Sequence, residues 1–186
     1  STIGSYRILL IGVAEGMQPL ASKAYGASQN GNATPAERIA AYDEIRHIRN
    51  KAIRTAIAAS VLLFLFTIAT ASFYPALYGY QGDAAAAGYH AVILTAAQLI
   101  FTGIVRVTNS FFYAVGKNRY SLFMIYFDPL CLTPAALAVL PHFFGTDGIW
   151  LTAVITQFLL NLVAAGMFVR HNAQMKREQA ALTKGV

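Results

Sequence analysis

The sequence predicts an all-α integral membrane protein, a polytopic bundle of about five transmembrane helices plus one amphipathic surface helix. Hydrophobic residues make up 56% of the 186 residues and charged residues only 12%, whereas a soluble domain carries about 25% charged residues. The apolar residues are also gathered in long runs, and about 20 such residues are needed to cross a bilayer as a helix. We treat residues 1–186 as one domain.

The first expected span covers about residues 3–25 and contains unusual polar groups. A glutamate at membrane depth costs about 2.5–3.5 kcal/mol on insertion scales, and this span carries Glu15 and Gln18. It also contains Gly16 and Pro19, which we expect to bend the helix. A bent, polar helix in lipid is expected to line a cavity, a path or a partner helix.

An amphipathic helix is expected at about residues 35–52. Thr34, Pro35 and Glu37 form a capping box with proline at the first helical position, which is a strong helix start. One stripe of the helix is apolar and the other faces are charged. We expect this segment to lie on the membrane surface; a solvated helical linker is the alternative.

Four more spans follow, at about residues 55–74, 84–115, 120–140 and 149–169, and a polar tail occupies 170–186. Residues 116–119 form a tight polar turn, so the third and fourth spans should be antiparallel neighbours. Pro129 and Pro134 lie inside the fourth span and are expected to bend it.

The lysines and arginines predict the orientation. They gather after the first span, in the turn after the third and in the tail, whereas the loops at 79–88 and 141–148 contain none. Because cytoplasmic loops are enriched in these residues, the C-terminus is expected in the cytoplasm. The net charge of +6 is therefore a topology signal, and nucleic acid is not an expected partner.

Three ionisable residues are expected near mid-membrane. Glu15, Arg106 and Asp128 each lie ten or eleven positions from a polar segment on the predicted cytoplasmic side, which is roughly 15 Å at about 1.5 Å per residue. Arg106 can face Asp128, and a simple ion pair joining two helices is one interpretation. The other makes Glu15 an unpaired carboxylate that binds a proton or cation. Arg7 is expected to extend to the headgroups.

Catalysis and metal binding find little support in the sequence. The single cysteine, Cys131, lies in an apolar run, and no spacing typical of a metal site is present. No Ser, His and Asp residues are expected at a shared depth, and the sequence contains no phosphate-binding glycine loop. We expect neither an enzyme nor a bound metal or organic cofactor.

Three motifs resemble those of multidrug and toxic compound extrusion (MATE) transporters. Residues 16–27 are similar to the G-x-Q-P-L-I-S-Y-N-Y-G-A signature of the eighth of twelve spans. Residues 111–117 resemble the FFQAIGK sequence that closes the tenth span, and 140–151 resemble the LP…FG…GVWL sequence between the last two. The resemblance implies that the five spans are the eighth to twelfth, and that the chain is a piece of a longer protein.

The resemblance implies a secondary active exporter in the inner (plasma) membrane. Such transporters move organic cations and other amphipathic compounds by alternating access, driven by H⁺ or Na⁺. The expected partners are membrane lipid, small amphipathic or cationic substrates and the missing N-terminal lobe. The tenth-like span carries Arg106 where the family would place a carboxylate, so the family's cation site is not carried over.

We therefore predict a fragment of a multidrug or toxin exporter that does not transport by itself. The expected ion-coupling or substrate-binding residues are Glu15, Gln18, Arg106, Asn109 and Asp128. Two alternatives stay open. One is a flippase for lipid-linked saccharides, which a lobe lined with several cationic residues would favour, and the other is a non-transporting membrane subunit.

Overall fold

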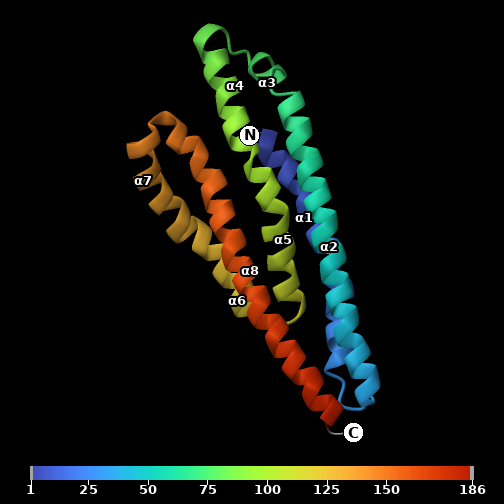
Figure 1. Cartoon of the computed structure of the whole chain (residues 1–186). Coiled ribbons are helices and arrows are strands. Elements are labelled where there is room, and N and C mark those ends of the chain that lie inside the picture. The colour runs from blue at the N-terminus through green and yellow to red at the C-terminus, as the bar shows by residue number, and fades with distance from the viewer. Residues whose placement is uncertain (1, 185–186) are drawn as a thin grey trace.

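The computed structural model describes residues 2–184, and these form helices joined by short turns, without a β-strand (Figure 1). The helices are α1 (Thr2–Ser28), α2 (Pro35–Ala69), α3 (Phe73–Leu77), α4 (Gly82–Ala96), α5 (Gln98–Ala114), α6 (Asn118–Phe127), the π-helical turn η1 (Asp128–Leu132), α7 (Thr133–Phe144) and α8 (Thr146–Lys184).

α5 lies at the centre of the bundle. It packs against the antiparallel pair α1 and α2 on one side and against α8 on the other, and α7 runs along α8 (Figure 1). The turn between α5 and α6 is tight, as predicted. It contains Gly116 at φ +68°, a left-handed conformation that glycine adopts without steric cost.

Four continuous helical stretches among residues 2–184 are long and apolar enough to cross a membrane. They are Pro35–Ala69, Gly82–Ala114, Asn118–Phe144 and Thr146–Thr183, and they correspond to the second to fifth expected spans. α1, the expected first span, has 27 residues and is also long enough. Its polar and charged side chains make it less apolar, and it falls outside this group.

The expected boundary between a surface helix at 35–52 and a span at 55–74 is wrong. The capping box is confirmed, because Thr34 Oγ1 accepts a hydrogen bond from Glu37 N and Glu37 Oε2 accepts one from Thr34 N. From there α2 continues unbroken to Ala69. No proline or glycine interrupts residues 36–69, so the change from polar to apolar composition does not end the helix, and the polar half cannot lie flat on the membrane.

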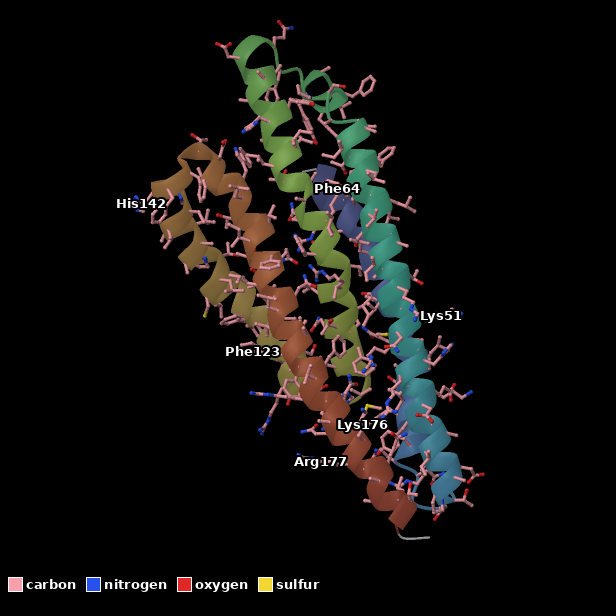
Figure 2. The ribbon with its side chains drawn as sticks, viewed as in Figure 1. Lys51, Phe64, Phe123, His142, Lys176 and Arg177 are labelled. Carbon is pink, nitrogen blue, oxygen red and sulfur yellow. The ribbon has the colours of Figure 1, made fainter. Side chains whose placement is uncertain are left out.

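The expected polar tail at 170–186 likewise continues the last span, since α8 extends to Lys184. At about 1.5 Å per residue α2 is about 52 Å long and α8 about 58 Å, whereas the hydrocarbon core is about 30 Å thick. Both helices therefore project beyond the apolar region at the basic end. Figure 2 shows Lys176 and Arg177 near this end of α8 and His142 at the opposite end of the molecule.

Side-chain contacts join the two projecting helices. Tyr42 Oη donates a hydrogen bond to Glu178 Oε2 at 2.7 Å, and the guanidinium of Arg49 donates to Asn172 Oδ1. Arg49 also lies over the ring of Phe168, 5.2 Å from its centroid. These contacts hold the projecting part of α2 against α8.

The two long stretches that border the site are not uniform α-helices. The stretch Gly82–Ala114 is interrupted at Ala97, between α4 and α5, and the stretch Asn118–Phe144 contains η1. In η1 the N–H of Thr133 bonds to the carbonyl of Asp128, five residues earlier. Of the predicted bend residues, Pro129 lies inside this wider turn and Pro134 lies just after it, in the first turn of α7. Proline cannot donate the backbone hydrogen bond of a regular α-helix. Pro19 lies inside the continuous helix α1.

Candidate functional site

A hollow of about 300 Å³ lies where α1, α5, α6, η1 and α8 meet. Charged and amide groups occupy part of its wall and apolar side chains the rest. The polar residues are Arg7, Arg106, Asn109, Asp128 and Gln157, and the apolar residues are Val105, Met124, Ile125, Pro129 and Leu160.

A second hollow of about 280 Å³ adjoins the first, because both are lined by Arg7, Asp128 and Gln157. It continues along α8 to Thr152 and Thr156. Three polar side chains of α8, those of Thr152, Thr156 and Gln157, therefore lie along the same wall. Together the two hollows form one polar furrow between the helices.

Asp128 is held in place by two side-chain hydrogen bonds. Gln157 Nε2 donates to Asp128 Oδ2 at 3.0 Å, and Thr133 Oγ1 donates to Asp128 Oδ1 at 2.9 Å. The carboxylate thus joins η1 to α8 and to the start of α7. A π-helical turn inside an α-helix is frequently found at functional sites, and here it carries the one carboxylate that lines the hollow.

Arg106 and Asp128 face the same hollow, as their antiparallel spans predicted. Within residues 2–184, however, they form no ion pair: the salt bridges found there are Arg46–Asp43 and His90–Asp147, both outside the hollow. Instead, the oxygens of Asp128 accept hydrogen bonds from the uncharged donors Thr133 and Gln157. The expected ion pair between the third and fourth spans is therefore absent from the described part of the chain.

Arg7 is the residue that sequence reasoning missed. Instead of extending to the headgroups, it lines both hollows, and its Nε is buried without a hydrogen-bond partner. The helical period of the sequence could have indicated this position. Arg7 is three residues before Leu10 and seven before Ala14, and these two residues belong to the buried face of α1. A residue on that face must point into the bundle.

Glu15 lies elsewhere. It is exposed on α1 and is not part of the hollow, so the shared depth of Glu15, Arg106 and Asp128 does not bring all three together. With Arg7 in its place, two positive charges face one negative charge, which gives a formal net charge of +1 in the hollow. Glu15, Arg106 and Asp128 together would have given −1.

The exposed face of α1 forms a continuous stripe. Gly12, Glu15, Gly16, Pro19 and Lys23 recur at helical spacing and are all exposed. Gln18, the other expected polar residue of this helix, is half-buried beside the stripe.

Asn109 links two helices at the edge of the hollow. Its Oδ1 accepts a hydrogen bond from the hydroxyl of Ser121 on α6. Nearer the start of α5, Asn161 of α8 donates to the carbonyl of Phe101 at 3.0 Å. Amide side chains thus fasten α5 to α6 and to α8, which is a common role of polar residues in helix bundles within membranes.

No three His, Cys, Asp or Glu side chains come together among the described residues in a way that could hold a metal ion.

Comparisons with known proteins identify the fold. No family model matches the sequence, and no curated protein matches it. A solved structure titled "Inward-facing conformation of a multidrug resistance MATE family transporter of the MOP superfamily" superimposes on 98% of this chain with a TM-score of 0.74 and 18% sequence identity. The chain has a MATE-like fold.

This likeness confirms the fold that the three sequence motifs predicted, an all-helical MATE-like lobe. The chain covers 39% of the length of that transporter. Because the identity is only 18%, the likeness concerns the arrangement of the helices and carries no residue-level assignment.

Proposed function

We propose that the chain is the C-terminal-lobe part of a secondary active MATE-like exporter. The observation that supports this most directly is the furrow of charged and amide side chains between helices that are long and apolar enough to span a membrane. Such groups are costly in lipid and are typical of substrate or ion pathways. The similar solved structure is that of a multidrug transporter, which favours export over a structural role.

In this proposal the lobe works against a second lobe that lies outside the chain. The exposed stripe of α1 faces that lobe, and its small residues allow close approach of another helix. The two lobes rock about the substrate, so that the furrow opens to one side of the membrane at a time. The protein lies in the inner (plasma) membrane, and the basic end of the bundle faces the cytoplasm.

Glu15 is the proposed coupling residue. It is a carboxylate on the face of α1 that no described residue covers, where it can exchange H⁺ or Na⁺ when the lobes separate. Gln18 on the same helix is a polar neighbour on the substrate path. Asp128 has a structural role, because its hydrogen bond with Gln157 fixes η1 to α8.

Efflux of ethidium, a fluorescent organic cation, from cells that make the full-length protein containing this chain tests the proposal. We expect efflux that is lost in Glu15→Gln at unchanged expression. Glu44→Gln, which alters an exposed carboxylate on α2, is the matched control and should behave as the unaltered protein. Absence of efflux for cationic, neutral and anionic probes alike would instead support a non-transporting subunit.

One observation favours a second candidate, a flippase for lipid-linked saccharides. Arg7 stands beside Arg106 in the hollow, so the lobe has more cationic groups at depth than its sequence suggested. Two guanidiniums are suited to the phosphates that join such lipids to their sugars.

A further inference from the structure

We propose that the hollow between α5, η1 and α8 binds an oxyanion, a carboxylate or phosphate group, through the guanidiniums of Arg7 and Arg106. This inference deepens the proposed export function, on which it rests, by naming the class of group that this part of the lobe recognises. It also separates two tasks, because organic cations would be repelled here and would bind nearer to the exposed Glu15.

The balance of hydrogen-bond donors and acceptors in the hollow favours an anion. A guanidinium carries five N–H donors and no acceptor, yet Arg7 Nε is buried without a partner, and Arg106 enters no hydrogen bond or ion pair with another described residue. Donors left unpaired in an apolar bundle are costly. Arg7 Nε therefore needs an acceptor that the described residues do not provide, and Arg106 faces the same hollow.

The net charge of the hollow also favours an anion. Asp128 and Arg7 both lie close enough to Arg106 to act on it electrostatically. Asp128 contributes a single negative charge, and its two oxygens already accept hydrogen bonds from Gln157 and Thr133. One further negative charge would bring the hollow to neutrality, and an oxyanion supplies both this charge and the missing acceptor atoms.

The shape and lining of the hollow suit an oxyanion that carries an apolar part. A guanidinium binds carboxylate and phosphate oxygens in a planar, bidentate arrangement. Next to the two arginines, the wall of the hollow is apolar over Val105, Met124 and Leu160. This combination suits an amphipathic anion, whose charged group meets the arginines while its apolar part lies against the aliphatic wall.

The oxyanion has two possible sources, a carboxylate of an exported compound or the phosphate of a membrane lipid. A matched pair of probes addresses the first: dansylphenylalanine, a carboxylate, and dansylphenylalaninamide, its neutral amide. Their binding is measured by dansyl fluorescence with the full-length protein purified in a neutral detergent. The same measurement in vesicles of phosphatidylcholine with and without phosphatidylglycerol addresses the lipid.

The unaltered protein should bind the carboxylate at least about tenfold more tightly than the amide, a difference of about 1.4 kcal/mol. Arg7→Gln and Arg106→Gln should each reduce the affinity for the carboxylate about tenfold and leave the affinity for the amide within about twofold. Arg54→Gln, which removes an exposed guanidinium on α2, is the control and should change neither. If the lipid is the ligand, phosphatidylglycerol should instead compete with the carboxylate, or bind in its place, in an arginine-dependent manner.

Equal affinity of the unaltered protein for carboxylate and amide, without arginine-dependent binding of phosphatidylglycerol, would overturn the inference. The inference would also be overturned if the glutamine variants lowered the affinity for both probes equally and lowered the melting temperature. The arginines would then pair with a carboxylate elsewhere in the protein. Should the glutamine variants not fold, Arg7→Lys and Arg106→Lys replace them, since lysine keeps the charge and loses the bidentate geometry. Weaker carboxylate binding alone supports the site, and unchanged binding contradicts it.

The outcome is distinguishable from failure of the export function. Ethidium efflux with neither carboxylate selectivity nor arginine-dependent binding of phosphatidylglycerol removes the oxyanion site and leaves the exporter. Carboxylate selectivity without transport of any probe keeps the site and removes the exporter.

Discussion

Gln157 of α8 donates a hydrogen bond from Nε2 to Oδ2 of Asp128 in η1, at a distance of 3.0 Å. This contact joins the last helix of the bundle to the π-helical turn in the middle of the preceding one. It also gives the carboxylate an uncharged partner, while Arg106 faces the same hollow. One amide group thus makes a contact between helices in the wall of the site.

The Gln157–Asp128 contact should stabilise the lobe. Gln157→Leu removes the donor and leaves a carboxylate oxygen to compete for Arg106, so we expect a loss of about 1 kcal/mol in the free energy of unfolding. Thermal unfolding in detergent measures the change. Gln174→Leu, the same substitution at an exposed position of α8, is the control, and an equal melting temperature for both variants would contradict the prediction.

Gly103 allows α5 to approach α2 closely. A Cβ atom at this position would lie 2.3 Å from Ser60 Oγ and 2.9 Å from the backbone oxygen of Ala56. Because the backbone cannot move aside as a side chain can, Gly103→Ala should destabilise the fold by about 1–3 kcal/mol, measured by the melting temperature.

Gly166→Ala is the matched control for Gly103→Ala. Nothing lies within 4 Å of a Cβ atom built at Gly166 on α8, and alanine is the better helix former, so its melting temperature should be unchanged or higher. Adding Ser60→Ala to Gly103→Ala should recover part of the loss. Identical behaviour of the two alanine variants would show that the α2–α5 contact is not close-packed.

The contact between Tyr42 and Glu178 should hold the projecting ends of α2 and α8 together. Tyr42→Phe removes the hydroxyl that donates to Glu178 and accepts from Gln29, and we expect a loss of about 1 kcal/mol. In a double-mutant cycle with Glu178→Gln, the two effects should not add. Tyr113→Phe, at an exposed tyrosine, should have no effect, and additive effects in the cycle would disprove the coupling.

Arg49 is expected to be sensitive even to lysine. Its guanidinium bonds to Asn172 and lies over Phe168 and Phe111, and only 7% of the residue is exposed. Lysine cannot reproduce a planar group that stacks and donates at once. Arg49→Lys should therefore reduce the free energy of unfolding by about 1–2 kcal/mol and lower the melting temperature accordingly. Arg54→Lys, at an exposed position, should leave the melting temperature unchanged. Equal melting temperatures would mean that the charge alone matters at residue 49.

The basic end of the bundle should face the cytoplasm. In a Cys131→Ser background, Asn32→Cys lies in the turn between α1 and α2 at the basic end, and Asp83→Cys lies at the start of α4 at the other end, both exposed. A membrane-impermeant maleimide added to intact cells should label Asp83→Cys and leave Asn32→Cys unlabelled until the cells are lysed. The reverse pattern would invert the proposed topology.

Local features of the molecule could be predicted from the sequence because they depend on neighbours in the chain. The apolar runs fixed four spanning stretches, the capping box fixed the start of α2, and Gly116 fixed the turn that makes α5 and α6 neighbours. The continuity of α2 was missed, because a change in polarity was treated as a boundary although no helix-breaking residue accompanies it.

The sequence by itself determined the class of the protein and the position of its polar groups along each helix, since helix length and composition suffice for both. Only the tertiary structure decided which of these groups meet. Meeting also requires the right direction around the helix, and Arg7 points into the bundle while Glu15 points out. Folding also decided that Asp128 bonds to Gln157 and Thr133, because these three residues lie on segments that only the tertiary structure brings together.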